Sequence, residues 1–62
     1  MKKGSVVQLI NAHSADMMYQ SSYGIVIEIF NGFDDHVILA RMCTPYLFHN
    51  DIACNLSRFR EV

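Results

Sequence analysis

The chain has 62 residues, of which 52% are hydrophobic, and its net charge is −1. This length predicts one domain over residues 1–62 with a small core. The balanced charge argues against a strongly basic nucleic-acid-binding protein, and no apolar run is long enough to span a membrane. Polar residues soon follow the basic start at Lys2 and Lys3, so we expect no signal peptide and a cytoplasmic location.

The first predicted strand covers residues 3–10, where apolar residues dominate. Side chains alternate between the two faces of a strand. Val7 and Leu9 therefore fall on one face, with Val6 and Ile10 on the other. We expect one of these faces to be buried.

A polar segment, residues 11–22, follows this strand. Its composition is typical of a surface loop, but its length is near the upper limit for a connection without structure of its own. Ser14 is of the type that caps helices, so a single helical turn over residues 15–19 is the alternative. The sequence leaves both interpretations open.

The second predicted strand, residues 23–30, is the most apolar part of the chain. Its β-branched residues suit a pleated sheet better than a helix. We expect its three isoleucines to face inward and Val26, Glu28 and Phe30 to face outward. Residues 31–35 contain Asn and Gly and predict a turn.

The third predicted strand covers residues 36–43. Arg41 should face water, which places Val37, Leu39 and Cys43 on the outer face with it. The residues expected on the inner face are Ile38, Ala40 and Met42.

The last third of the chain has two interpretations. In the first, Pro45 ends the third strand, a fourth strand covers residues 46–52, residues 53–57 turn, and residues 58–62 form a closing strand. In the second, apolar residues recur at helical spacing from Ile52 onward, after residues typical of a helix cap. We favour the first, and we expect a mainly β fold with at most a short C-terminal helical turn.

The order of these segments resembles a known family. Residues 3–7, 23–29 and 37–42 resemble the strands of the small SH3-like barrels encoded by short reading frames of tailed bacteriophages. They are also similar to KOW-type barrels, in which residues 24–26 would occupy the Gly-x-Val signature. The resemblance implies a small five-stranded SH3-like barrel. It implies less about function, because this barrel serves many unrelated roles.

Metal binding would need thiolates or imidazoles that converge from closely spaced pairs. The best candidates are Cys43, His49 and Cys54, with His36 as a fourth, but they form no such pair in the sequence. We therefore expect no metal and no cofactor, and two buried thiols. A bridge between Cys43 and Cys54 is the alternative.

Catalytic equipment is equally sparse. His13, Ser14 and Asp16 are residue types used in nucleophilic catalysis, but catalytic triads normally join distant segments. Asp34 and Asp35 are expected to be solvated at a hairpin tip. The three glycines are scattered and form no phosphate-binding loop. We expect no enzymatic activity.

Nucleic-acid binding is the alternative function. Four of the five basic residues lie near the chain ends. They are Lys2, Lys3, Arg58 and Arg60. The first and last strands of an SH3-like barrel are neighbours, so the resemblance implies one basic patch that binds nucleic acid weakly and in a salt-sensitive way. The aromatic residues that would stack on bases are Tyr23, Tyr46 and Phe48. The simpler explanation is a solvated sheet edge.

A protein-binding face is the first hypothesis. If Glu28 lies opposite Arg41 in the hairpin, an apolar stripe forms on the outer face. The stripe consists of Val26, Phe30, Val37 and Leu39. Exposed clusters of this kind are usually covered by a partner. We therefore expect a non-enzymatic protein–protein interaction module that self-associates or docks on a larger protein, with Phe30 as an anchor. The family resemblance suggests a phage structural or accessory protein, located in the host cytoplasm or in a virion.

Overall fold

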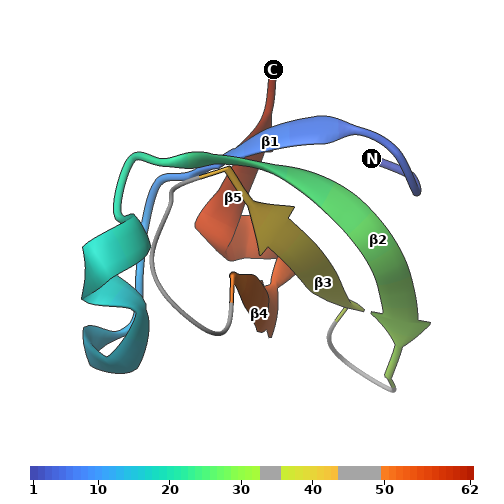
Figure 1. The fold of residues 1–62 in the computed structure, drawn as a ribbon. Coiled ribbons are helices and arrows are strands. Elements are labelled where there is room, and N and C mark those ends of the chain that lie inside the picture. Colours follow the sequence, from blue (N-terminus) through green and yellow to red (C-terminus); the bar gives the residue numbers. More distant parts are fainter. Residues whose placement is uncertain (33–35, 44–49) are drawn as a thin grey trace.

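The computed structural model describes residues 1–32, 36–43 and 50–62, and the fold is mainly β, as predicted (Figure 1). Five antiparallel strands in this part of the chain form one sheet in the order β4-β3-β2-β1-β5. The strands are β1 (Val6–Leu9), β2 (Tyr23–Asn31), β3 (His36–Met42), β4 (Asp51–Asn55) and β5 (Phe59–Glu61). Two short 3-10 helices accompany them, η1 (Ser14–Tyr19) and η2 (Leu56–Arg58).

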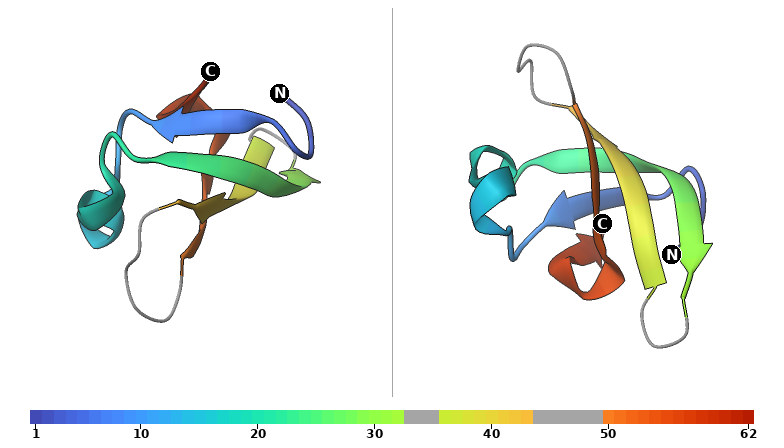
Figure 2. Two further views of the ribbon diagram at one scale, coloured as in Figure 1. Left: turned by 45° about the horizontal axis from the view of Figure 1, so that its top comes forward. Right: turned by 90° about the horizontal axis from the view of Figure 1, so that it is seen from below.

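The sheet is strongly bent. Figure 1 shows β2 as a long arch with β3 and β4 inside its curve, while β5 rises past it toward the C-terminus, and Figure 2 shows the same bend from two other directions. The first and last strands are neighbours, with Gln8 opposite Arg60 and Leu9 opposite Phe59. This pairing brings the two ends of the chain together, as the predicted barrel requires.

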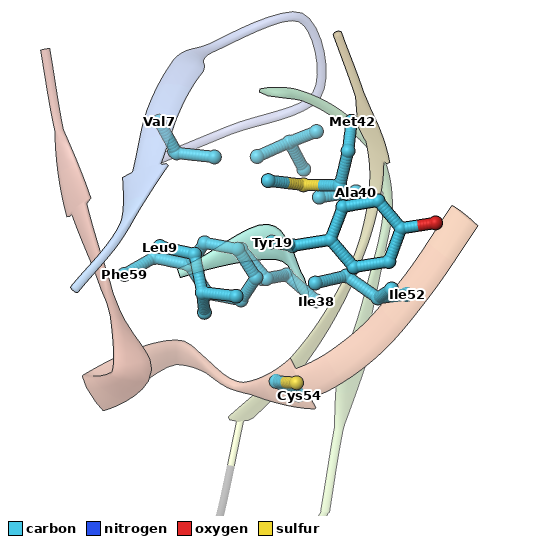
Figure 3. Packing of buried hydrophobic residues seen from close by; sticks show 10 residues of the cluster. Val7, Leu9, Tyr19, Ile38, Ala40, Met42, Ile52, Cys54 and Phe59 are labelled. Carbon is cyan, nitrogen blue, oxygen red and sulfur yellow. The ribbon is translucent and has the colours of Figure 1, made fainter. Parts of the chain in front are cut away.

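One cluster of buried apolar side chains fills the inside of the bend (Figure 3). Its members are Val7, Leu9, Tyr19, Val26, Ile38, Ala40, Met42, Ile52, Cys54 and Phe59. Every strand contributes at least one of them, so the core depends on residues from both ends of the chain. Full burial of one large aliphatic side chain stabilises a fold by roughly 1.5–3 kcal/mol. The inner face predicted for β3 is confirmed, and in β1 the buried face is the one that carries Val7 and Leu9.

The faces of β2 differ from the prediction because this strand contains a β-bulge. Val26 pairs with Ala40 and Glu28 pairs with Leu39, so Ile27 is an extra residue without a position opposite it. A bulge reverses the alternation of side chains beyond it. The prediction that Val26 faces outward is wrong, since Val26 is only 1% exposed. The prediction that all three isoleucines face inward is also wrong.

On either side of the bulge, the isoleucines of β2 have different surroundings. Ile25 precedes the bulge and is 43% exposed on the outer face. Ile29 follows it, pairs with the buried Ile38, and packs partly against the core. The unbroken alternation assumed from the sequence placed both residues on the same face.

The strand β1 is shorter than predicted because the chain turns before it. Gly4 has a φ of +89°, which only glycine adopts readily. Its N–H donates to the carbonyl oxygen of Val26 at 2.8 Å, while the N–H of Ser5 donates to the carbonyl oxygen of Lys2 at 3.0 Å. Regular pairing therefore begins only at Val6.

Of the two interpretations for residues 11–22, the helical turn is correct. The helix η1 forms there, but Ser14 is its first residue rather than its cap. His13 occupies the capping position, and no side chain caps the helix.

In the last third, the strand interpretation is correct and the longer helix is wrong. The predicted turn over residues 53–57 begins too early, since β4 continues to Asn55 and η2 provides only a short turn. The prediction for residues 44–49 lies outside the described residues, as does most of the predicted turn at residues 31–35.

Gly24 gives a first test of this packing, since it is buried in β2 opposite Met42. An added Cβ would lie 2.7 Å from the Met42 Sδ and 3.0 Å from the carbonyl oxygen of Arg41. The sulfur can move, but the backbone of β3 cannot move without disturbing the sheet. We expect Gly24→Ala to lower the free energy of unfolding by about 1–3 kcal/mol, measured by urea denaturation. Unchanged stability would contradict the close approach of β2 to β3.

Candidate protein-binding face

The outer face of the sheet, away from the core, carries large apolar side chains next to one another. Val6 in β1 lies opposite Ile25 in β2, and Gln8 lies opposite Tyr23. Val6 is 44% exposed and Tyr23 is 48% exposed. Val6, Tyr23 and Ile25 together are called the β1–β2 patch below. This patch was not predicted from the sequence, because regular alternation along β2 placed Ile25 in the core.

A second group lies at the other end of the β2–β3 hairpin. Phe30 is 52% exposed and lies opposite Val37, and the next residue on the outer face of β3 is Leu39. Val37 and Leu39 are half-buried. Phe30, Val37 and Leu39 are called the hairpin patch below. These are three of the four residues of the predicted stripe, and the fourth, Val26, belongs to the core.

The predicted register of this hairpin is wrong. Arg41 lies opposite Ile25 rather than Glu28, and Glu28 lies opposite Leu39. The bulge at Ile27 accounts for part of this shift, because it changes the pairing along the rest of the strand. The predicted register depended on an ion pair between Glu28 and Arg41. This pair does not form, and each of the two residues has a different charged neighbour.

Charged groups beside the two patches are paired with one another. The Arg41 Nε donates to Asp51 Oδ1 at 2.9 Å, and a second guanidinium nitrogen donates to Asp51 Oδ2 at 3.1 Å. The Lys3 Nζ lies 3.4 Å from Glu28 Oε2. Exposed pairs of this kind contribute little stability. Each pair joins one positive and one negative group, so these four charged residues add no net charge to the outer face.

One of the predicted basic residues, Arg58, lies apart from Lys2 and Lys3. The N–H groups of Ile10 and Asn11 donate to the carbonyl oxygen of Arg58, which places Arg58 at the C-terminal end of β1. Lys2 and Lys3 precede the N-terminal end of the same strand. The pairing of β1 with β5 thus spreads the cations along the strand.

Other polar groups accompany these cations. The Arg60 Nε donates to Gln8 Oε1 at 2.8 Å, and an Arg58 guanidinium nitrogen donates to the carbonyl oxygen of Asn11 at 2.8 Å. The carboxylate of Glu61 lies 3.1 Å from the N-terminal amine. Of the aromatic residues considered for base stacking, Tyr23 is exposed, while Tyr46 and Phe48 lie outside the described residues.

The two cysteines have different environments, and both are free thiols. Cys54 is buried, as predicted, but Cys43 is exposed at the end of β3, so the prediction of two buried thiols is wrong for Cys43. Cys54 lies opposite Ile38, five residues before Cys43 along β3. That separation is about 16 Å along a strand, too far for a disulfide.

The predicted metal candidates do not converge. His36 begins β3 and Cys43 follows its other end, while Cys54 faces the core from β4. His49 lies outside the described residues. Among the residues that the structure describes, no three His, Cys, Asp or Glu side chains are grouped as metal ligands.

Two of the residues considered for catalysis, His13 and Asp16, take part in hydrogen bonds within the fold. The N–H of Asp16 donates to the carbonyl oxygen of His13 at 2.9 Å within η1. The carboxylate of Asp16 instead accepts a hydrogen bond from Cys54 Sγ, with the Sγ and Oδ2 atoms 3.3 Å apart. These residues are 38 positions apart, so no local sequence pattern could have indicated the contact. Asp34 and Asp35 lie outside the described residues.

Burial, and next the hydrogen bond to Asp16, raise the pKa of the Cys54 thiol from 9.0 to about 11. A thiol with a raised pKa stays protonated at neutral pH, and the thiolate is the nucleophilic form. The contact therefore ties η1 to β4 and does not activate the sulfur.

No protein-family model, curated protein or solved structure matches this chain. The assignment to SH3-like or KOW-like barrels therefore stays a prediction from the residue pattern. Neither of the helices in the described ranges has the length and apolarity needed to cross a membrane.

The raised pKa of Cys54 predicts a pH dependence of stability. The unfolded chain loses the thiol proton above about pH 9, whereas the folded protein keeps it until about pH 11. Ionisation therefore favours unfolding, and the stabilisation by the protonated thiol is present below pH 9 and lost as the pH rises to 11.

The test compares free energies of unfolding at several pH values between 9 and 11. We expect stability to fall more steeply with pH in the wild type than in Cys54→Ala, because the variant lacks the titrating group. Tyrosine and lysine also titrate in this range, so the difference between the two slopes is the informative quantity. Cys43→Ala is the matched control and should keep the wild-type slope. Equal slopes in wild type and Cys54→Ala would show that Cys54 does not titrate as described.

Proposed function

We propose that this protein is a non-enzymatic protein–protein interaction module that docks on a larger protein through the outer face of its sheet. The observation that carries the proposal is the exposure of the β1–β2 patch and of Phe30 on this face. In a chain of 62 residues, these side chains represent apolar area that the domain itself leaves uncovered. Neighbouring exposed apolar side chains are typical of interaction surfaces.

The chemistry of the face fits a protein partner. Tyr23 and Phe30 are aromatic, and aromatic residues are enriched at the energetically important positions of interfaces. The ion pairs Arg41–Asp51 and Lys3–Glu28 provide polar groups beside the apolar patches. An apolar centre with polar surroundings is the usual arrangement of a protein interface.

Nucleic-acid binding by a KOW-like module is the second candidate. One observation favours it: Gln8 lies between Arg60 and Tyr23 in the sheet, so a cation and an exposed aromatic ring flank the same residue. Against it, Arg58 and Arg60 already donate to groups of the protein, and the carboxylates of Glu28 and Glu61 lie among the cations. The mixed charge favours a protein partner.

The biological setting is proposed on the family resemblance alone. A small SH3-like protein of a tailed phage would act as a structural or accessory protein. Its partner would be a virion component or a host protein, and it would be found in the host cytoplasm or in the virion.

Substitutions on the outer face test the proposal. We expect Phe30→Asp and Ile25→Asp each to lower the amount of captured partner about tenfold or more, because a charge would be buried in the interface. The measurement is quantitative mass spectrometry of proteins retained by the immobilised chain. Met18→Asp is the matched control, since Met18 is 59% exposed on η1 rather than on the face.

The proposal requires that the captured protein be retained by wild type and Met18→Asp and lost by both face variants. Loss of retention with Met18→Asp alone would place the binding surface on η1. Circular dichroism of each variant checks that the fold survives. Unfolding of Phe30→Asp would show that Phe30 belongs to the core.

A salt titration separates the two candidate functions. Binding to generic single- and double-stranded nucleic acid should be undetectable at physiological salt if the outer face serves a protein partner. Affinity that falls steeply with salt and is lost in Arg60→Gln would support the KOW-like alternative, since salt dependence reports phosphate contacts. Arg41→Gln removes one positive charge outside the predicted basic patch and is the control for a nonspecific effect of charge.

A further inference from the structure

The strand β4 lies at an edge of the sheet and pairs, within the described residues, with β3 alone. The N–H of Met42 donates to the carbonyl oxygen of Asn50 at 2.7 Å, which fixes the hydrogen-bonding pattern of this strand pair. In an antiparallel pair, residues alternate between positions bonded to the neighbour and positions that face away. Ile52 and Cys54 therefore bond toward β3, and the backbone N–H and C=O of Ala53 face the open edge.

In the part of the chain that the structure describes, the middle of β4 has no charge, proline or bulge that would prevent edge-to-edge pairing. Natural proteins protect edge strands with lysine, proline, bulges or inward-pointing charges. The sequence of β4 is Asp-Ile-Ala-Cys-Asn, with regular pairing to β3 throughout. Its central residue, Ala53, is exposed and uncharged, so its side chain does not repel a second strand.

The opposite edge, β5, is a poorer partner. It has three residues, of which Arg60 and Glu61 are charged. The N–H of Phe59 already donates to the carbonyl oxygen of Leu56. In a head-to-tail contact between β4 and β5 of another copy, the Phe59 N–H would not be available to β4, and β4 would lie beside the charged Arg60 and Glu61. The better partner for β4 is therefore β4 of a second copy.

We propose that two copies of this chain pair antiparallel along β4, centred on Ala53, to form one continuous sheet. A two-fold axis would place Ala53 opposite Ala53 of the second copy, and the two residues would exchange two backbone hydrogen bonds. Asp51 would face the uncharged Asn55 of the second copy, so no like charges meet. Ile52 would lie opposite Cys54 of the second copy, which continues the buried side of one sheet into the other.

This contact is distinct from the proposed docking face. It uses the edge of the sheet and leaves the β1–β2 patch and the hairpin patch open. The dimer would thus present two outer faces to a larger protein, and two linked sites bind a repetitive partner more tightly than one. Because the surfaces differ, either proposal can fail while the other holds.

The test uses two substitutions at Ala53 and sedimentation equilibrium over a range of micromolar concentrations. Ala53→Lys places two ammonium groups opposite each other across the axis and should weaken the dimer about tenfold or more. Ala53→Val keeps the N–H and the neutral side chain and should remain a dimer, since β-branched residues suit strands. Both variants should keep the wild-type circular dichroism spectrum, because the substituted side chain is exposed.

Amide hydrogen exchange gives a second measurement at the same position. In wild type and Ala53→Val, the backbone N–H of residue 53 should exchange more slowly at high protein concentration than at low concentration. In Ala53→Lys, its exchange rate should not depend on protein concentration. A wild-type monomer at high micromolar concentration would overturn the proposal. A dimer that survives Ala53→Lys but dissociates in Ile25→Asp would also overturn it, and would assign self-association to the outer face.

Discussion

Between Val26 and Glu28, β2 contains one residue more than the length of β3 opposite it. Before this point the strand buries Val26 against Ala40. After it, Ile29 turns toward Ile38 and Phe30 is left on the outside. A bulge also increases the local bend and twist of a strand. The bend lets one sheet enclose its own core, so the division of the hairpin into core and surface depends on this single irregularity.

The core inside the bend draws on contacts that are remote in sequence. Val7 and Leu9 come from the first strand, and Phe59 comes from the last. The helix η1 adds Tyr19 and is joined to β4 by the contact of Asp16 with the Cys54 thiol. A domain of this size buries only about 60% of the surface that its unfolded chain exposes. Small connections such as this one therefore matter more than they would in a larger protein.

The same size limit explains the character of the surface. Among residues 1–32, 36–43 and 50–62, one sheet surrounds one core, and Tyr23, Ile25 and Phe30 of β2 are left exposed on its outer face. Paired charges at Arg41 and Lys3 keep this face near neutrality. This composition is the basis for proposing a protein partner, because nucleic-acid binding depends on positive charge that is free to contact phosphates.

Several features were determined by the sequence. The β-branched residues of β2 and β3 specify strands. Alternation from the solvated Arg41 assigned Ile38, Ala40 and Met42 to the core, and alternation in β1 placed Val7 and Leu9 on one shared face. The exposure of Phe30 and the outward positions of Val37 and Leu39 were also predicted. These successes share a cause: each depends on a regular repeat of two residues within one strand.

Tertiary structure decided the remainder. The bulge at Ile27 depends on how β2 fits β3 around a shared core, so no pattern within β2 marks it, and the faces of Ile25 and Val26 were misassigned. The spread of the cations followed from the register of β1 with β5, which fixes where Arg58 lies relative to Lys3. The Asp16–Cys54 contact and the open edge at Ala53 likewise arise from the placement of distant segments. Periodicity identifies which residues alternate, but only packing determines where the alternation changes and which strands lie at the edges of the sheet.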